Sequence, residues 1–362
     1  MINDKLISAA LDPIFTVYAQ NDDVRDFYKE VTADVKEAAQ ALLDNKQATV
    51  PQQAVEMAVK SLGDLTEPLQ LISSPAASAA VATTSATVAQ SWSDTEVRHI
   101  ILRADETQVR LVASADAQIH VHQFQQPKLA ASKLQLKQSE DTLYLAAPSP
   151  RWFQYLIPFR HPKSVVEIAL PAQFAGTLDV DLKSGSLSAT DLTNQLRATL
   201  TLRSGGITME HVQFKTLSAQ LTSGSFKANH LVCETLSLNA HSGAVHLANV
   251  ETIFDLSAHS GLVKGNMLAG AGQFDVHSGS LTLNWQRIDG DIAVINHSGT
   301  VKLQAPAADS FKFDLQAQSG TVKVTRNATY SLQVQGAALG QVGEAPQYSV
   351  TVKNHSGTIR LN

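Results

Sequence analysis

A Ser-Gly pair recurs nine times in the second half of the chain at nearly constant spacing. The pairs begin at Ser184, Ser204, Ser223, Ser242, Ser260, Ser278, Ser298, Ser319 and Ser356. Seven of the eight steps are 18 to 21 residues long, and the last step of 37 residues is about two periods. A fixed period of about 19 residues is typical of a solenoid, whose coils bury their apolar faces only against neighbouring coils.

Apolar residues fill the same two positions of every repeat. Four residues before the Ser stand Val180, Leu200, Ala219, Leu238, Leu256, Phe274, Val294, Leu315 and Val352, and three after it stand Leu187, Ile207, Phe226, Val245, Val263, Leu281, Val301, Val322 and Ile359. Because a strand alternates its side chains with period two, both columns indicate strands that face a common interior, whereas a helix would scatter these groups.

A third apolar position lies eight residues after the Ser. It is filled by Leu192, Val212, Leu231, Val250 and Leu268. Three short strands per coil predict an all-β parallel β-helix, which we expect to be right-handed because parallel crossovers almost always are.

The Ser-Gly pair itself is typical of a tight corner. Gly adopts positive φ without a Cβ clash, and a Ser in each coil can hydrogen-bond to the next coil about 4.8 Å away. We interpret the Ser column as a structural ladder that needs no nucleophilic role. Between Ser319 and Ser356 one corner has lost its Ser, and we interpret residues 330–336 as a further coil, followed by a longer loop over 337–347.

The chain divides into three predicted regions. Residues 1–72 carry helical stripes, such as Val31, Val35 and Ala38, and we expect a small bundle of three or four helices there. Residues 73–92 are rich in Ala, Ser and Thr and too polar to span a membrane, so they are a predicted linker. Residues 93–362 form the predicted β-helix.

The charge of the chain limits its partners. The formal net charge is −5, and no cluster of Lys and Arg interleaves with aromatic residues, which argues against nucleic acid. Residues 1–72 hold 12 acidic and 6 basic residues. This surplus is either the solvated face of the bundle or a docking surface for a protein partner. No nucleotide or phosphate-loop fingerprint is present, and we expect no cofactor.

The sequence predicts a cytoplasmic protein. An apolar run near the N-terminus is interrupted by Asp12 and Pro13, which does not fit an export signal, and no membrane span is predicted. The single cysteine, Cys233, fits a reducing compartment and is predicted to be a buried small hydrophobe. The alternative location is the cell envelope or surface.

The run that begins at Val165, VVEIALPAQFAGTLDVDLKSGSLSA, joins a Leu-Pro strand end and a turn to the first Ser-Gly coils. This combination resembles a bacterial β-strand-repeat family of unknown function that carries an adhesin label. The likeness covers about residues 93–362. It implies a parallel β-helix and no enzyme activity.

The N-terminal segment resembles the small helical domains of the HAAS type, which occur in envelope-stress operons of Gram-positive bacteria. The likeness rests on Ala58, Leu62, Gly63 and Asp64, which end one helix and precede another. HAAS-type domains commonly precede membrane helices, and none is predicted in this chain. The resemblance implies a link to envelope stress.

Histidines stand directly before five of the Ser-Gly pairs, at His241, His259, His277, His297 and His355. Imidazoles stacked about 4.8 Å apart could hold a transition metal. Metal sites, however, converge three or four ligands on one point, and a straight ladder offers only neighbouring pairs. We interpret these residues as stacked, solvent-facing corner groups, with a metal site at His241, His259, His277 and His297 as the alternative.

The most concentrated apolar and aromatic stretch precedes the Leu-Pro strand end. It contains Trp152, Phe153, Tyr155, Phe159 and Arg160. Either this stretch covers an end of the solenoid, which solenoids require, or it is an exposed patch for a partner or for self-association.

Carboxylates do not form a catalytic pair in the predicted coils. Asp179, Asp255 and Asp314 share a register position but lie on distant coils, whereas glycoside hydrolysis needs two carboxyls at a defined separation. We therefore predict a non-catalytic scaffold or protein-interaction module linked to envelope stress. The alternative is a surface adhesin whose β-helix face binds glycan or matrix.

Overall fold

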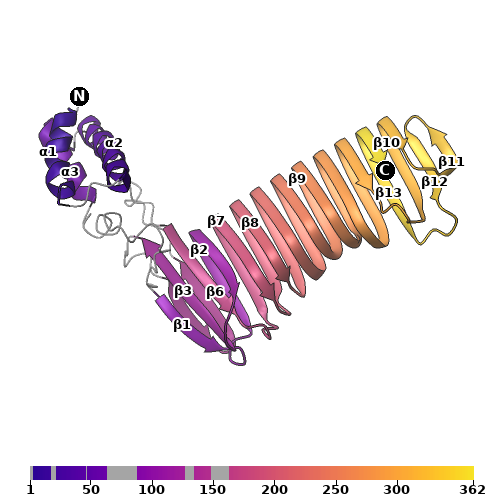
Figure 1. Cartoon of the computed structure of the whole chain (residues 1–362), viewed down its shortest axis with the longest axis horizontal. Coiled ribbons are helices and arrows are strands. Elements are labelled where there is room, and N and C mark those ends of the chain that lie inside the picture. The colour runs from indigo at the N-terminus through magenta and orange to yellow at the C-terminus, as the bar shows by residue number, and fades with distance from the viewer. Residues whose placement is uncertain (1–2, 18–21, 46, 63–87, 127–133, 148–162) are drawn as a thin grey trace. The chain divides into compact units, whose positions relative to one another are not determined.

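The computed structural model describes residues 3–17, 22–45, 47–62, 88–126, 134–147 and 163–362. These residues belong to two compact units, one helical and one built of strands (Figure 1). The predicted interaction stretch, Trp152, Phe153, Tyr155, Phe159 and Arg160, lies outside the described residues. Its two interpretations stay predictions.

The helical unit contains three helices, α1 (Asp4–Phe15), α2 (Asp22–Asp44) and α3 (Pro51–Leu62). The Asn3 side chain caps α1 by accepting a hydrogen bond from the Lys5 backbone N–H. The helices share one apolar core, whose buried members are Ile7, Leu11, Phe15, Val31, Val35, Ala38, Ala39, Ala48, Ala54, Val55 and Ala58. Phe15 packs edge-on against Tyr28 across this core, with ring centroids 5.1 Å apart.

Stacked parallel coils form the middle of the β unit (Figure 1). Their strands are β7 (Thr177–Thr193), β8 (Arg197–Gln213), β9 (Thr216–Gln304), β13 (Tyr348–Leu361) and β10 (Phe311–Val324). Each Ser-Gly pair lies in register with the next, as Ser184 does with Ser204 and Ser204 with Ser223. The predicted parallel solenoid is confirmed for these coils.

The interior of the coils is one continuous apolar core. The column four residues before each Ser and the column eight residues after it, from Leu192 to Leu268, are buried throughout, as alternation predicts. Cys233 is also buried there, with its Sγ atom 3.3 Å from Thr252 Oγ1. Burial raises the pKa of the Cys233 thiol, which favours its neutral form. Cys233 is therefore a small apolar residue of the core.

The Ser-Gly corners bring neighbouring coils into very close backbone contact. Gly205 has φ of +117°, and a Cβ placed on it would lie 1.7 Å from the carbonyl oxygen of Gly185. The Ser hydroxyl donates a hydrogen bond to the coil before it, as Ser242 does to the Thr222 carbonyl at 3.1 Å. The sequence-based interpretation of the Ser column as a structural ladder agrees with these contacts.

One coil precedes the first Ser-Gly pair. Strand β2 (His99–Ala113) pairs in parallel with β7, and Glu106 and Thr107 occupy the corner opposite Ser184 and Gly185. This coil lies within the predicted β-helix of residues 93–362, but it lacks the Ser-Gly signature, so the repeat alone does not identify it. Its inner column is nevertheless apolar, because Leu102 and Val109 stand where the later coils have their two core positions.

Antiparallel strands close the N-terminal end of the β unit. They are β1 (Val88–Ser93), β3 (Gln118–Gln126), β4 (Gln135–Ser139), β5 (Thr142–Ala147) and β6 (Lys163–Leu170). Strand β3 lies antiparallel between β1 and β6, while β5 and β6 each pair in parallel with β2. Residues 88–92, which the sequence analysis assigned to the linker, are therefore part of the sheet.

The C-terminal end corrects two expectations. Residues 330–336 are not a coil, and 337–347 is not a plain loop, because β11 (Thr329–Val334) and β12 (Ala337–Val342) form an antiparallel hairpin beside β10. The last strand, β13, does not extend the stack but lies between β9 and β10. The hairpin thus covers the outer edge of β10, and the final Ser-Gly coil is inserted inside the ladder.

Candidate interaction surface

The histidine column forms a straight stack on the outside of the coils. The ring centroids of His241 and His259, and of His259 and His277, are 4.7 Å apart with nearly parallel planes, and His277 lies 4.6 Å from His297. All four side chains are exposed. In the part of the chain that the structure describes, no three His, Cys, Asp or Glu side chains gather as a metal site. The geometry is that of stacked corner groups.

A second outward column escaped the sequence analysis. Seven residues after the Ser, five successive coils place a non-glycine residue in the left-handed region, with φ between 51° and 55°: Asp191, His211, His230, Asn249 and Met267. Asp, Asn and His tolerate this conformation better than most residues, so their recurrence was the available signal. His211 and His230 stack here with centroids 4.7 Å apart.

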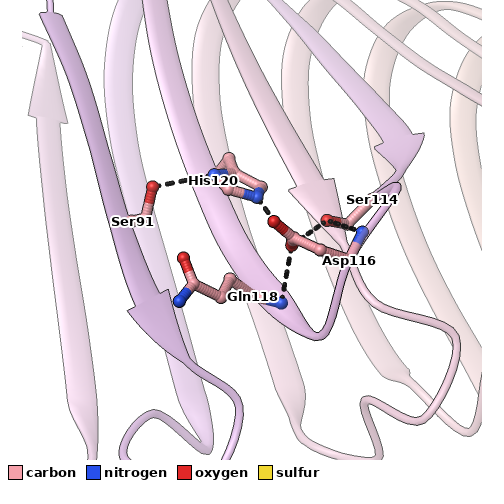
Figure 2. Close-up of polar contacts among 5 residues, drawn as sticks. All are labelled: Ser91, Ser114, Asp116, Gln118 and His120. Atoms are coloured by element: carbon pink, nitrogen blue, oxygen red, sulfur yellow. Dashed lines mark hydrogen bonds and ion pairs between the residues drawn. The ribbon is translucent and has the colours of Figure 1, made fainter.

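A Ser-His-Asp cluster lies at the N-terminal end of the β unit, and the sequence analysis missed it (Figure 2). His120 on β3 contacts Ser91 Oγ on β1 through Nδ1 and Asp116 Oδ1 through Nε2, each at 2.8 Å. The contact with His120, together with hydrogen bonds from the Gln118 backbone N–H and the Ser114 hydroxyl, lowers the pKa of the Asp116 carboxyl.

This cluster has the residue types of a hydrolase triad but not its setting. A triad needs a site where a substrate carbonyl meets both the nucleophile and the oxyanion donors. Ser91 and Asp116 are exposed, and they line neither the cavity beside β12 nor the groove that contains Lys227 and Lys264. The hydrogen bonds join the edge strand β1 to β3 and its preceding turn, so the cluster acts as a clasp.

The strands after each corner carry a distinct outer surface. We call it the post-corner face and define it as the residues two, four and six positions after each Ser, from the Ser223 coil to the end of the stack. An open groove of about 620 Å³ lies on the first part of this face. Its polar lining residues on this and the preceding coil are Thr208, Glu210, Lys227, Asn229, His246, Lys264 and Asn266.

Stacking order places the basic side chains of this face in one column. They are, along the stack, Lys227, His246, Lys264, Lys302, Arg360 and Lys323, and Thr282 occupies this position on the coil between Lys264 and Lys302. Arg360 lies in register with Lys302 on one side and with Lys323 on the other, because β13 is inserted between β9 and β10. The sequence analysis did not single out this column, since chain order separates Arg360 from its two neighbours.

These features define a parallel β-solenoid with antiparallel ends and columnar outer faces. A family model, Toastrack DUF4097, matches residues 97–362, and the chain belongs to this family. The predicted resemblance over about residues 93–362 is thereby confirmed. Residues 1–72 lie outside the matched range, so their likeness to HAAS-type domains stays a prediction.

Several solved structures are similar to this chain, among them the following two. One is a proposed cell adhesion protein from Clostridium sporogenes, with 10% identity, a TM-score of 0.28, and coverage of 76% of this chain and 97% of the other. The second, a proposed adhesin from Bacteroides fragilis, has 12% identity, a TM-score of 0.37, and coverage of 76% and 96%. No curated protein matches the chain. None of the helices within the described residues is long and apolar enough to cross a membrane.

Proposed function

We propose that this protein is a non-catalytic binding protein whose β-solenoid is a rigid scaffold for an extended partner. The observation that carries the proposal is the straightness of the outward columns. Corner glycines hold successive coils in fixed register, so a side chain such as Lys302 repeats its position on the neighbouring coil as Arg360. Such a surface presents like groups in a row, which suits a long partner better than a compact substrate.

Cell fractionation tests where this binding takes place. The full chain is followed in cytoplasm, envelope and culture fluid, and intact cells are treated with protease. A chain found on the outer surface supports an adhesin, whereas a chain found only inside supports an intracellular scaffold linked to envelope stress. The adhesin is the second candidate function, and the exposed basic column of the post-corner face favours it because a row of cations suits an anionic glycan.

Binding itself is tested with isolated envelope fragments. We expect the purified full chain to co-sediment with them, and hydrogen exchange to slow in the solenoid strands of the bound chain. Failure to bind any fraction, with the chain folded, would contradict the proposal.

The non-catalytic part of the proposal is tested at the Ser-His-Asp cluster. We expect an activated ester such as p-nitrophenyl acetate to be hydrolysed at the same background rate by the native chain and by Ser91→Ala. A rate that falls at least tenfold in Ser91→Ala, with an unchanged melting temperature, would make Ser91 a nucleophile and refute a purely binding role.

We also propose that the acidic helical unit contacts a protein partner. Exposed carboxylates at Asp44 and Glu56 support this. The double variant Asp44→Asn/Glu56→Gln of the full chain should lose partners that the native chain retains in a cross-linking experiment, while keeping its melting temperature. Identical partners in both samples would contradict this contact.

A further inference from the structure

The two faces that flank the Ser-Gly corner differ in charge. From the Ser223 coil onward, the outward positions two, four and six residues after the Ser hold five Lys or Arg residues and no carboxylate. On the same coils, the positions three, five and seven residues before the Ser hold four carboxylates and two cations: Asp255, Asp275, Asp291, Asp314, Lys312 and Lys353. One side of the scaffold is therefore basic, although the chain as a whole is acidic.

The cations of the post-corner face are available to a ligand. Lys227, Lys264, Lys302, Lys323 and Arg360 are all exposed. Among the described residues none of the five takes part in an ion pair, while elsewhere Lys183, Arg103 and Arg287 each pair with a carboxylate. Lys302, Arg360 and Lys323 stand on adjacent coils and repel each other, so an anion that lies across them is stabilised.

Neutral hydrogen-bonding groups flank the cation column on both sides. Hydroxyls stand two residues after the Ser, as in Thr300, Thr358 and Thr321, and amides stand six residues after it, as in Asn266 and Asn284. Some of these groups already contact each other, for example Thr321 Oγ1 and Thr358 Oγ1 at 3.4 Å. A ligand with both carboxylates and hydroxyls would find partners for each kind of group.

We propose that the post-corner face binds a linear acidic polysaccharide with one carboxylate on each sugar, laid along the axis of the solenoid. Neighbouring coils are about 4.8 Å apart, which is comparable with the length of one sugar unit in an extended chain. Five of the seven coils from Lys227 to Lys323 present a Lys or Arg, and His246 and Thr282 stand at this position on the other two. Six coil steps separate Lys227 from Lys323, about 29 Å, so the full face accommodates about six sugars. This proposal rests on the proposed binding function and names its ligand.

Nucleic acid fits the same face less well. Single strands bind through aromatic side chains on which bases stack, besides a basic groove. The outward residues of the post-corner face contain no Phe, Tyr or Trp. Hydroxyl and amide columns suit sugar hydroxyls, and lysines spaced along a flat strand surface suit separate point charges.

The test measures anisotropy of a fluorescent hexagalacturonate with the purified full chain at low salt. We expect saturable binding that weakens as NaCl rises, is lost when the carboxylates are methyl-esterified, and is weaker for the trimer. The variant Lys302→Gln/Lys323→Gln should lower the affinity at least about fivefold, and so should Lys227→Gln/Lys264→Gln.

The matched control removes the same charge from the opposite face. Lys312→Gln/Lys353→Gln changes two exposed cations on the same terminal coils, and the affinity should change less than about twofold. Equal losses in the two terminal variants would refute a specific face. Equal binding of methyl-esterified hexamer, or tighter binding of polyphosphate or oligo-dT, would also overturn the proposal.

Absence of hexamer binding would overturn the ligand assignment alone if the chain still co-sediments with envelope fragments. If Lys302→Gln/Lys323→Gln binds those fragments as tightly as the native chain, the partner uses another face. If the native chain binds neither hexamer nor fragments, the proposed binding function itself fails. Melting temperatures of all variants establish that each is folded.

Discussion

The middle coils and the two ends of the β unit pair their backbone N–H and C=O groups in different ways. In the middle, every strand pairs in parallel with a copy of itself one coil away, so one local rule satisfies all backbone groups. At the ends no next coil exists. At the N-terminal end β5 and β6 pair in parallel with β2, and antiparallel pairing begins one strand further out, with β3 against β6. At the C-terminal end β12 lies antiparallel to β10. The repeat therefore specifies the middle, and the ends require sequences of their own.

The ends also differ from each other. At the N-terminal end, β2 is a full coil without the Ser-Gly corner, and two strands that come later in the chain, β5 and β6, pair with its outer side. At the C-terminal end the corner is complete, but the chain passes outward to the hairpin β11–β12 before β13 returns inside. The N-terminal end thus departs from the repeat in its local sequence, and the C-terminal end departs from it in the order of the strands along the chain.

The largest effect is expected at a corner of the middle coils. Gly205→Ala places a Cβ 1.7 Å from the Gly185 carbonyl oxygen at a φ of +117°, so two coils must separate. We expect a loss of more than about 4 kcal/mol in the free energy of unfolding, or failure to fold. Chemical denaturation of the full chain measures it.

The adjacent residue is the matched control for this corner. A Cβ on Gly206 would lie 3.3 Å from the Ser225 hydroxyl, and Ser occupies the equivalent position in neighbouring coils. Gly206→Ala should change the stability by less than about 1 kcal/mol. Similar losses for the two variants would show that the corner does not depend on close backbone approach.

Truncation of a core column should be the next most costly change. Leu256 is buried within β9, and Leu256→Ala leaves a cavity between coils, with an expected loss of roughly 2–5 kcal/mol. Lys264 is exposed on the same strand, and Lys264→Ala should remain within about 0.5 kcal/mol. Equal effects at the two sites in thermal or chemical unfolding would contradict the register of the middle coils.

The difference between middle and ends explains what the sequence could predict. Alternation around each Ser-Gly pair identifies inward positions because every middle coil repeats the same local geometry. The repeat alone does not identify the coil of β2, since Thr107 stands where later coils have Gly, although its core residues Leu102 and Val109 fit the columns. The pairing of strands at the two ends of the β unit depends on which segment of the chain returns to the edge of the sheet, and no local sequence pattern predicts which segment does so.

The candidate surface was predictable only in part. The histidine column follows directly from the alignment and appears as a stack. The basic column does not, because its strongest segment, Lys302, Arg360 and Lys323, is contiguous only after β13 is inserted between β9 and β10. The Ser91, His120 and Asp116 cluster likewise joins β1, β3 and a turn, which are neighbours only through antiparallel pairing.

A clasp at the C-terminal end should have an intermediate effect. Arg326 donates hydrogen bonds from Nη2 to the carbonyl oxygens of Ala305 and Pro306, and its guanidinium lies over the Phe311 ring. Arg326→Ala removes both bonds from half-buried carbonyls, and we expect a loss of about 1–3 kcal/mol. Hydrogen exchange should accelerate in β10 and β13 more than in β7. Uniform acceleration would show that the end is not a separate cooperative region.

The smallest effect is expected at the N-terminal clasp, where it should depend on pH. Because hydrogen bonds from His120, the Gln118 backbone N–H and Ser114 lower the pKa of Asp116, the folded chain favours the carboxylate. The resulting stabilisation is present above the ordinary carboxyl pKa of 3.8 and is lost as pH falls below it.

Asp116→Asn should lower the melting temperature by no more than about 2 °C at pH 6, since the group is exposed. The difference from the native chain should vanish toward pH 3, whereas Asp275→Asn, an exposed change on a middle coil, should leave the melting temperature unaltered at both pH values. If the melting temperature of Asp116→Asn is still lower than that of the native chain by the same amount at pH 3, the clasp depends on the shape of the side chain and not on its charge.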